Sequence, residues 1–164
     1  MKVLLSPAKA IDMTKTVNTT ESTSPLFLNE AEGLMKKMSK FSSKKIGKMM
    51  HLSTDLSDLN FERNQNWKPI VESNDENAHA IAVFNGEVYR GFDATSLSKD
   101  QLVEAQEKVR VLSGLYGILK PLDVIYPYRL EMGTKWAVTP AKKNLYKFWG
   151  TKITDALNTP PLNA

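Results

Sequence analysis

The chain of 164 residues contains no cysteine and only two histidines, His51 and His79. Without thiols it can form no disulfide, thiolate zinc site or iron–sulfur cluster, and it has no cysteine nucleophile. Neither histidine has a second histidine at helical spacing, so a histidine-based metal site is not indicated. We therefore predict no metal ion and no cofactor.

Long apolar runs are also missing. No stretch approaches the roughly 18 residues that a membrane-spanning helix requires, and Pro7 and Lys9 interrupt the amino-terminal apolar stretch too early for a signal peptide. The Walker and dinucleotide-binding glycine patterns and the G-x-S-x-G motif are absent as well. These absences favour a cytoplasmic protein without a membrane partner, and they exclude several common enzyme classes.

The remaining composition is that of an ordinary globular protein, with a net charge of +4. The charge is unevenly distributed. Residues 1–50 contain nine basic residues (Lys or Arg) and four acidic ones (Asp or Glu), so this part is basic. Residues 51–107 contain four basic and eleven acidic residues, and residues 108–164 contain nine basic and three acidic residues. Clustered basic residues favour an anionic partner, whereas solvated helix faces explain the same pattern equally well.

Apolar residues at three- and four-residue spacing predict several amphipathic helices. We expect helices over 28–41, from Ser42 or Ser43, after Ser53 with Leu56, Leu59 and Phe61 on the apolar face, from Ser98 to Gly114, and over 145–157. Ser98 and Gln101 have the spacing of a capping box, and Gly114 is a typical helix end.

Strand signals are fewer. Lys2–Ser6 is typical of a short buried strand, and Tyr126–Met132 of an extended segment. The apolar run before Asn85-Gly86 and the alternating run after it predict a β-hairpin, with a lone buried strand as the alternative. The fold class that we expect is α+β (mixed α/β), with short strands and several amphipathic helices.

Polar residues that could contact a ligand follow the opening strand. Ser6, Lys9 and Asp12 stand directly after it, where α/β sheets bind ligands. Lys9 offers a compact positive charge and Ser6 a hydroxyl donor. A solvated turn is the alternative interpretation.

A second candidate segment contains Gly114, Tyr116, Gly117 and Lys120. A glycine turn between two helices can present backbone N–H groups to phosphate oxygens, and a tyrosine there can stack on an exposed base. The alternative is a helix C-cap followed by a turn.

Farther along the chain, Arg129 and Glu131 flank Leu130. On a strand they would point to the same face, either as part of a site or as a structural ion pair.

Five ordered motifs together resemble one known family. They are Ser-Pro-Ala-Lys at 6–9 with Asp12, Phe84–Tyr89 with Gly91, Leu112–Asp123, Pro127–Gly133 and Tyr146–Gly150. The sequence resembles the YaaA family of bacterial peroxide-stress-resistance proteins over residues 1–158. Ala10 stands where the family pattern has threonine, and the chain is shorter than family members, as a carboxy-terminally truncated member would be.

The resemblance implies a single YaaA-like domain over 1–158, incomplete at its carboxyl end, followed by a disordered tail at 159–164. It further implies a cytosolic protein that protects DNA during hydrogen peroxide stress and limits damage from free intracellular iron. DNA binding by the family is associated with a positively charged cleft and a helix-hairpin-helix element. Here the best match to that element is Gln101–Leu122, with its hairpin at Gly114–Gly117.

We consider two main functions. In the first, the protein is a non-enzymatic binder of double-stranded DNA without strong sequence preference. Its nucleic-acid contacts would come from Ser6, Lys9, Gly114, Tyr116, Gly117, Lys120 and Arg129, chiefly to phosphates. In the second, it is an enzyme acting on a nucleic-acid base or nucleotide, with Lys9, Arg129 and Glu131 as catalytic candidates. Direct iron sequestration ranks last, because cysteines and histidine clusters are missing. The oligomeric state is not indicated.

Overall fold

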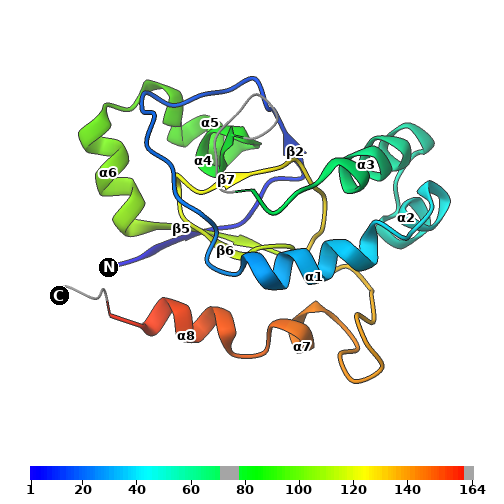
Figure 1. Ribbon diagram of the computed structural model, residues 1–164. Helices are drawn as coiled ribbons and strands as arrows, with labels where there is room; N and C mark the ends of the chain where they lie inside the picture. The colour runs from blue at the N-terminus through cyan, green and yellow to red at the C-terminus, as the bar shows by residue number, and fades with distance from the viewer. Residues whose placement is uncertain (71–77, 161–164) are drawn as a thin grey trace.

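The computed structural model describes residues 1–70 and 78–160. Small β-sheets lie at the centre and helices surround them (Figure 1). The helices are α1 (Leu28–Met38), α2 (Ser43–Met50), α3 (Thr54–Asn66), α4 (Ala80–Val83), α5 (Glu87–Phe92), η1 (Ala94–Ser96), α6 (Lys99–Lys108), α7 (Leu145–Trp149) and α8 (Lys152–Asn158). The mixed α+β class is confirmed. Most of the tail expected at 159–164 lies outside the described residues.

The largest sheet has three strands, β1 (Val3–Leu5), β5 (Val109–Ser113) and β6 (Gly117–Leu119). The central strand β5 pairs parallel with β1 and antiparallel with β6. Val109, Val111 and Ser113 are buried on one face of β5, and the residues between them are partly exposed. This alternation matches the two-residue period of a strand with one covered face.

Two smaller sheets connect distant parts of the chain. β2 (Ala10–Ile11) pairs with β4 (Phe84–Asn85), and β3 (Ala78–His79) pairs with β7 (Val124–Ile125), both antiparallel. The amino-terminal segment is thereby fixed against residues more than 70 positions away.

The helices expected from periodicity and caps are largely confirmed. α1 covers the core with Ala31, Leu34, Met35 and Met38, and the side chains of Ser42 and Ser53 cap α2 and α3. Ser98 and Gln101 form the expected capping box at the start of α6. The last helical stretch is divided into α7 and α8 at Gly150, which has a positive φ of 53° that favours glycine. None of the helices in the described ranges is long and apolar enough to cross a membrane.

The prediction of a β-hairpin at Asn85-Gly86 is wrong. Residues before it form the short helix α4, and residues after it begin α5. A two-residue type I′ turn needs positive φ at both positions, whereas Gly86 has a φ of −158° and caps α5 in an extended conformation. β4 instead pairs with β2, so a non-local partner replaces the expected local one.

The helix expected to reach Gly114 ends at Lys108 instead. Val109–Ser113 form β5 because they pair with β1, a partner from the other end of the chain. Gly114–Tyr116 therefore connects the strands β5 and β6, and the helix-hairpin-helix-like element expected at Gln101–Leu122 is a helix followed by a β-hairpin. The segment expected to be extended at 126–132 follows β7 without forming a strand.

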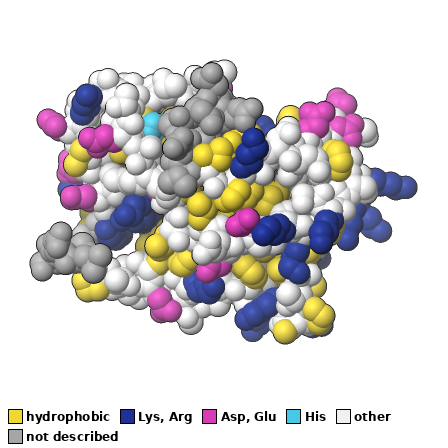
Figure 2. Space-filling model, in the orientation of Figure 1, with side chains coloured by type: hydrophobic (Ala, Val, Ile, Leu, Met, Phe, Trp, Pro, Cys, Tyr) yellow, Lys and Arg dark blue, Asp and Glu magenta, His cyan; other side chains and the backbone are white. Residues whose placement is uncertain are grey.

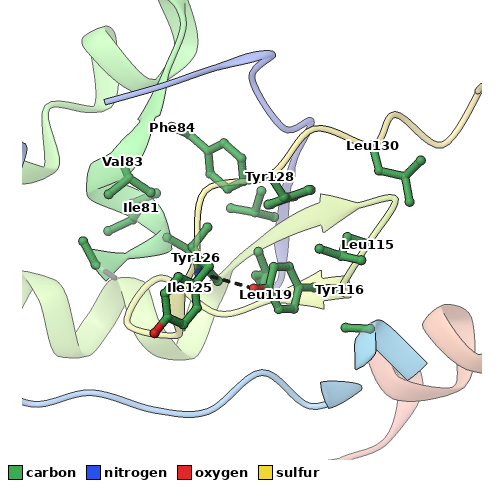
Figure 3. Packing of buried hydrophobic residues seen from close by; sticks show 14 of the residues in the cluster. Ile81, Val83, Phe84, Leu115, Tyr116, Leu119, Ile125, Tyr126, Tyr128 and Leu130 are labelled. Carbon is green, nitrogen blue, oxygen red and sulfur yellow. Dashed lines mark hydrogen bonds between the residues drawn. The ribbon is translucent and has the colours of Figure 1, made fainter. Parts of the chain in front are cut away.

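Tyrosines with hydrogen-bonded hydroxyls form the centre of the core (Figure 3). The Tyr116 hydroxyl accepts a hydrogen bond from the Trp67 indole at 2.9 Å, and the Tyr116 and Tyr128 rings meet edge to face. Ser113 Oγ and the Tyr128 hydroxyl share a hydrogen bond of 2.5 Å. Burial raises the pKa of both tyrosines, so both stay neutral.

The β5–β6 turn is also held by close approach to other backbone. The Trp149 indole donates to the Gly114 carbonyl at 3.0 Å. A Cβ on Gly114 would lie 2.2 Å from the Leu130 carbonyl oxygen, which is backbone and has little freedom to move. The turn and the segment around Leu130 therefore depend on glycine at position 114.

Gly114→Ala should lower the free energy of unfolding by about 2 kcal/mol or more, because the added methyl group overpacks against backbone. Gly133→Ala is the matched control, since its Cβ would meet nothing within 4 Å, and it should change stability by at most about 0.5 kcal/mol. Urea denaturation of both variants measures the difference. Equal stability of the two would contradict the close approach.

Candidate functional site

Lys9, Arg129 and Glu131 come together in the structure. They line one small surface hollow with Pro7, Ala8, Tyr128 and Leu130. Lys9 Nζ lies 3.3 Å from Glu131 Oε1. Their catalytic role stays a prediction, for which this common placement is a requirement.

Several contacts of the backbone fix the hollow. On one side, the Tyr89 hydroxyl donates to the Ser6 carbonyl at 2.6 Å, and Ala10 is paired with Asn85 just after Lys9. On the other side, Leu130 is buried and its carbonyl packs on Gly114, so Arg129 and Glu131 are turned toward the surface. Core packing thus positions the charged side chains.

The charges of the hollow are accessible to a ligand. The side chains of Lys9 and Glu131 are 66% and 45% exposed, and an ion pair at such a surface contributes at most about 1 kcal/mol. Arg129 is half-buried, and its Nε has no hydrogen-bond partner among the described residues. An anion could therefore replace Glu131 as the partner of Lys9 at little cost.

Ser6 lies at a second, larger hollow of about 550 Å³. Pro7 and Glu131 line both hollows, so the two are adjacent. The wall of the larger one also includes Leu112, Met132, Trp149 and Ile153. A mainly apolar hollow beside a charged one is a typical arrangement for a ligand with a ring and a charged group.

Gly114, Tyr116 and Gly117 are all buried. The Tyr116 ring is 1% exposed, so no surface of it is open for stacking on a base. Gly117 has a φ of 72°, and a Cβ there would lie 2.7 Å from the Trp149 ring. The expected nucleic-acid contacts of these three residues remain a prediction, and their burial does not favour it.

Lys120 is exposed but lies at a different hollow, whose wall also contains Lys2, Arg110 and Asp123. Of the residues expected to contact nucleic acid, Lys9 and Arg129 line the small hollow, and Ser6 and Gly114 line the larger hollow beside it.

Sequence reasoning missed Arg63 and Tyr126. They line a fourth hollow, between α3 and the segment after β7, and Arg63 is close enough to Arg129 for the two charges to interact. α3 was expected to turn Leu56 and Leu59 inward, but both are 40% exposed. The prediction of an inward apolar face was therefore wrong for the two leucines, whereas Phe61 is partly buried and packs against the core. Ser57, Asn60 and Asn64 are the buried residues, and their polarity gave no signal of an inward face.

The structure thus defines a mixed α+β domain in which the hollows at Lys9, Lys120 and Arg63 each combine cations with a single carboxylate. Comparison with known sequences identifies the family: a model described as "Peroxide stress protein YaaA" matches residues 1–163, and the chain belongs to this family. The membership supports a role in peroxide stress.

Curated relatives carry the name UPF0246 protein. One from Burkholderia multivorans is 47% identical over 158 residues, which are 96% of this chain and 60% of the relative. The relatives from Burkholderia pseudomallei and Dechloromonas aromatica are each 46% identical over 159 residues. These residues are 96% of this chain, 60% of the Burkholderia pseudomallei protein and 61% of the Dechloromonas aromatica protein. The chain spans about three fifths of the length of these relatives.

The buried carboxylate of Asp123, near Lys120, predicts how the stability of the protein depends on pH. Its carboxylate is buried and accepts hydrogen bonds from Thr23 Oγ1 at 2.6 Å and from the Lys120 N–H at 2.7 Å. Burial raises its pKa to about 6. The folded protein therefore binds the proton more tightly than the unfolded chain, and stability should fall as pH rises from about 4 to about 6, by up to about 3 kcal/mol.

Asp123→Asn should remove this contribution. Urea denaturation of both proteins between pH 4 and 7 measures it. A difference in stability between wild type and variant that stays constant over this range would contradict the raised pKa.

Proposed function

We propose that this chain is a DNA-binding domain of a protein that protects DNA during hydrogen peroxide stress and limits the damage that free intracellular iron promotes. The proposal rests on the packing of the two basic thirds of the sequence against each other. Family membership supports the link with peroxide stress.

An aromatic contact joins the two basic parts. Phe41, after α1, and Trp136, before α7, meet edge to face with ring centroids 5.8 Å apart. Lys45 of α2 lies over the Phe41 ring, with its Nζ 3.9 Å from the centroid. Lys135, next to Trp136, is exposed. The lysines of α2 and the segment before α7 are therefore neighbours.

A second contact joins α1 and α8, since Lys152 Nζ lies 2.7 Å from Glu30 Oε1. The remaining lysines on this side are exposed: Lys36, Lys37, Lys40, Lys44 and Lys48. We call these five, with Lys45 and Lys135, the basic surface. Figure 2 shows Lys and Arg side chains gathered on this part of the molecule.

Such a surface suits the phosphate backbone of duplex DNA. Lysine ammonium groups on flexible stems contact phosphates as point charges and read no base edges. Binding would therefore have little sequence preference and would weaken steeply as salt rises. Lys9 and Arg129 are proposed to add phosphate contacts beside this surface.

Lys44→Gln with Lys48→Gln should weaken duplex binding and reduce its salt dependence. If both lysines contact phosphates, the slope of log K against log salt falls in magnitude by about 2. Lys99→Gln with Lys108→Gln is the control, with the same charge change on α6 at the opposite end of the molecule (Figure 1). Fluorescence anisotropy over a salt series measures both. Salt-independent binding, or equal loss in the two double variants, would contradict the proposal.

A second candidate function is supported by the convergence of Lys9, Arg129 and Glu131. An enzyme acting on a base or nucleotide could place the base in the adjacent hollow of about 550 Å³ and the phosphate near the two cations. Glu131 would act as general acid or base and Lys9 as electrophile or nucleophile.

This candidate predicts that the protein converts a deoxynucleotide or a single-stranded oligonucleotide to a product detectable by mass spectrometry. Glu131→Gln should lower the rate about 100-fold or more, while Glu21→Gln, at an exposed glutamate outside this hollow, should not. Absence of any product with the wild-type protein would exclude the candidate and leave DNA binding untouched.

A further inference from the structure

The buried face of α3 is polar. Ser57, Asn60 and Asn64 are at most 4% exposed, while the leucines of the same helix face solvent. Ser57 Oγ donates to the Ser53 carbonyl, and Asn60 Nδ2 donates to the Leu56 carbonyl. Asn60 Oδ1 and both polar atoms of the Asn64 side chain have no hydrogen-bond partner among the described residues. Apolar packing alone does not account for such a face.

The segment after β7 has unpartnered polar atoms too. The Tyr126 hydroxyl and Arg129 Nε are buried, and within the described ranges neither has a hydrogen-bond partner. The Tyr126 backbone N–H donates a hydrogen bond to the Tyr116 hydroxyl (dashed line in Figure 3). The hydroxyl of Tyr126 itself has no such partner among the described residues. Tyr126 is only 5% exposed.

A hollow of about 350 Å³ separates these two elements. Its wall consists of Leu59, Glu62, Arg63, Asn66, Lys68, Tyr126 and Pro127. The described wall thus contains two cations and one carboxylate, and Arg129 follows two residues after Pro127. The hollow is large enough for a phosphate group that carries a sugar or a base.

Arg63 and Arg129 are near enough for their charges to interact, and within residues 1–70 and 78–160 no acid is paired with either of them. Burial lowers the pKa of Arg63, and the neighbouring charge of Arg129 lowers it further. No carboxylate of the described residues, Glu62 included, lies within 4 Å of a nitrogen of either arginine. Two half-buried like charges repel each other, and an anion between them would relieve that repulsion.

We propose that the hollow between α3 and Tyr126–Pro127 binds a phosphomonoester, with Arg63 in its wall as the charged donor, the charge of Arg129 acting on it from outside the wall, and the Tyr126 hydroxyl as a neutral donor. Guanidinium groups match phosphate oxygens in pairs. A phosphomonoester near neutral pH carries close to two negative charges, which balances two arginines, whereas a backbone phosphodiester carries only one. The inference goes beyond duplex binding, because it assigns strand ends or free nucleotides to a separate site.

Isothermal titration with inorganic phosphate and with a deoxynucleoside 5′-monophosphate tests the site directly. Arg63→Gln should weaken the binding of both about tenfold or more, because it removes a charged donor. Arg90→Gln, at an exposed arginine on α5, is the matched control and should not change it. No binding by the wild type, or equal weakening by the two variants, would overturn the proposal.

Tyr126→Phe is a second variant that does not depend on the charge. Because its hydroxyl has no partner within the described chain, the variant should fold with unchanged or higher stability. It should nevertheless bind the monophosphate several-fold more weakly. Unchanged affinity of this variant for the monophosphate would show that the Tyr126 hydroxyl does not donate to the ligand.

Oligonucleotides distinguish the two sources of a monoester. A 5′-phosphorylated strand should compete with the free monophosphate, and the same strand with a 5′-hydroxyl should not. If only the free nucleotide binds, the site takes nucleotides rather than strand ends. Lys44→Gln with Lys48→Gln should retain monophosphate binding, and Arg63→Gln should retain the salt-dependent part of duplex binding. A failure of one proposal can therefore be told apart from a failure of the other.

Discussion

The contact between the β5–β6 turn and the segment around Leu130 is the constraint on which the rest of the structure depends. Gly114 allows its backbone to meet the Leu130 carbonyl, and Trp149 donates to the Gly114 carbonyl from α7. Ser113 and Tyr128 are hydrogen-bonded beside this contact. The close contact between the backbones of Gly114 and Leu130 therefore joins the three-stranded sheet, the segment with Arg129 and Glu131, and the carboxy-terminal helices.

The site residues follow from this constraint. Because Leu130 and Tyr128 are buried in the core, the residues that alternate with them, Arg129 and Glu131, reach the surface. Parallel pairing of β1 with β5 then brings Lys9 to the same place from the start of the chain. The motif around Gly114 contributes to the site mainly by packing, since Tyr116 and Gly117 are buried, and Gly114 itself lines the larger hollow.

Local features of the fold could be predicted from the sequence, and non-local ones could not. The caps at Ser42, Ser53 and Ser98 act within one helical turn, so their chemistry is visible in a few adjacent residues. The strand Val109–Ser113 has helical spacing and β-branched residues together, and only its partner near the amino terminus decides between the two. The pairing of β4 with β2 overrode a local turn signal in the same way.

The candidate site was predictable to a similar extent. Lys9, Arg129 and Glu131 could be selected because polar residues in short motifs stand out, and their convergence could be checked only in three dimensions. Arg63 could not be selected, because it occurs on a helix whose leucines suggested the opposite buried face. Tyr126 is an ordinary core tyrosine in the sequence, and only the burial of its hydroxyl without a described partner distinguishes it.

The two kinds of cation in this protein differ in a way that suits two kinds of phosphate. The basic surface has exposed lysines spread over α1, α2 and the segment before α7, which suits the repeating single charges of a duplex backbone. Arg63 and Arg129 are half-buried and near enough for their charges to interact, which suits one compact ligand with a higher charge. Burial strengthens the electrostatic interaction of the second pair, because water screens it less. Lysine contacts would thus hold the strand, and the arginine pair would distinguish its phosphorylated end.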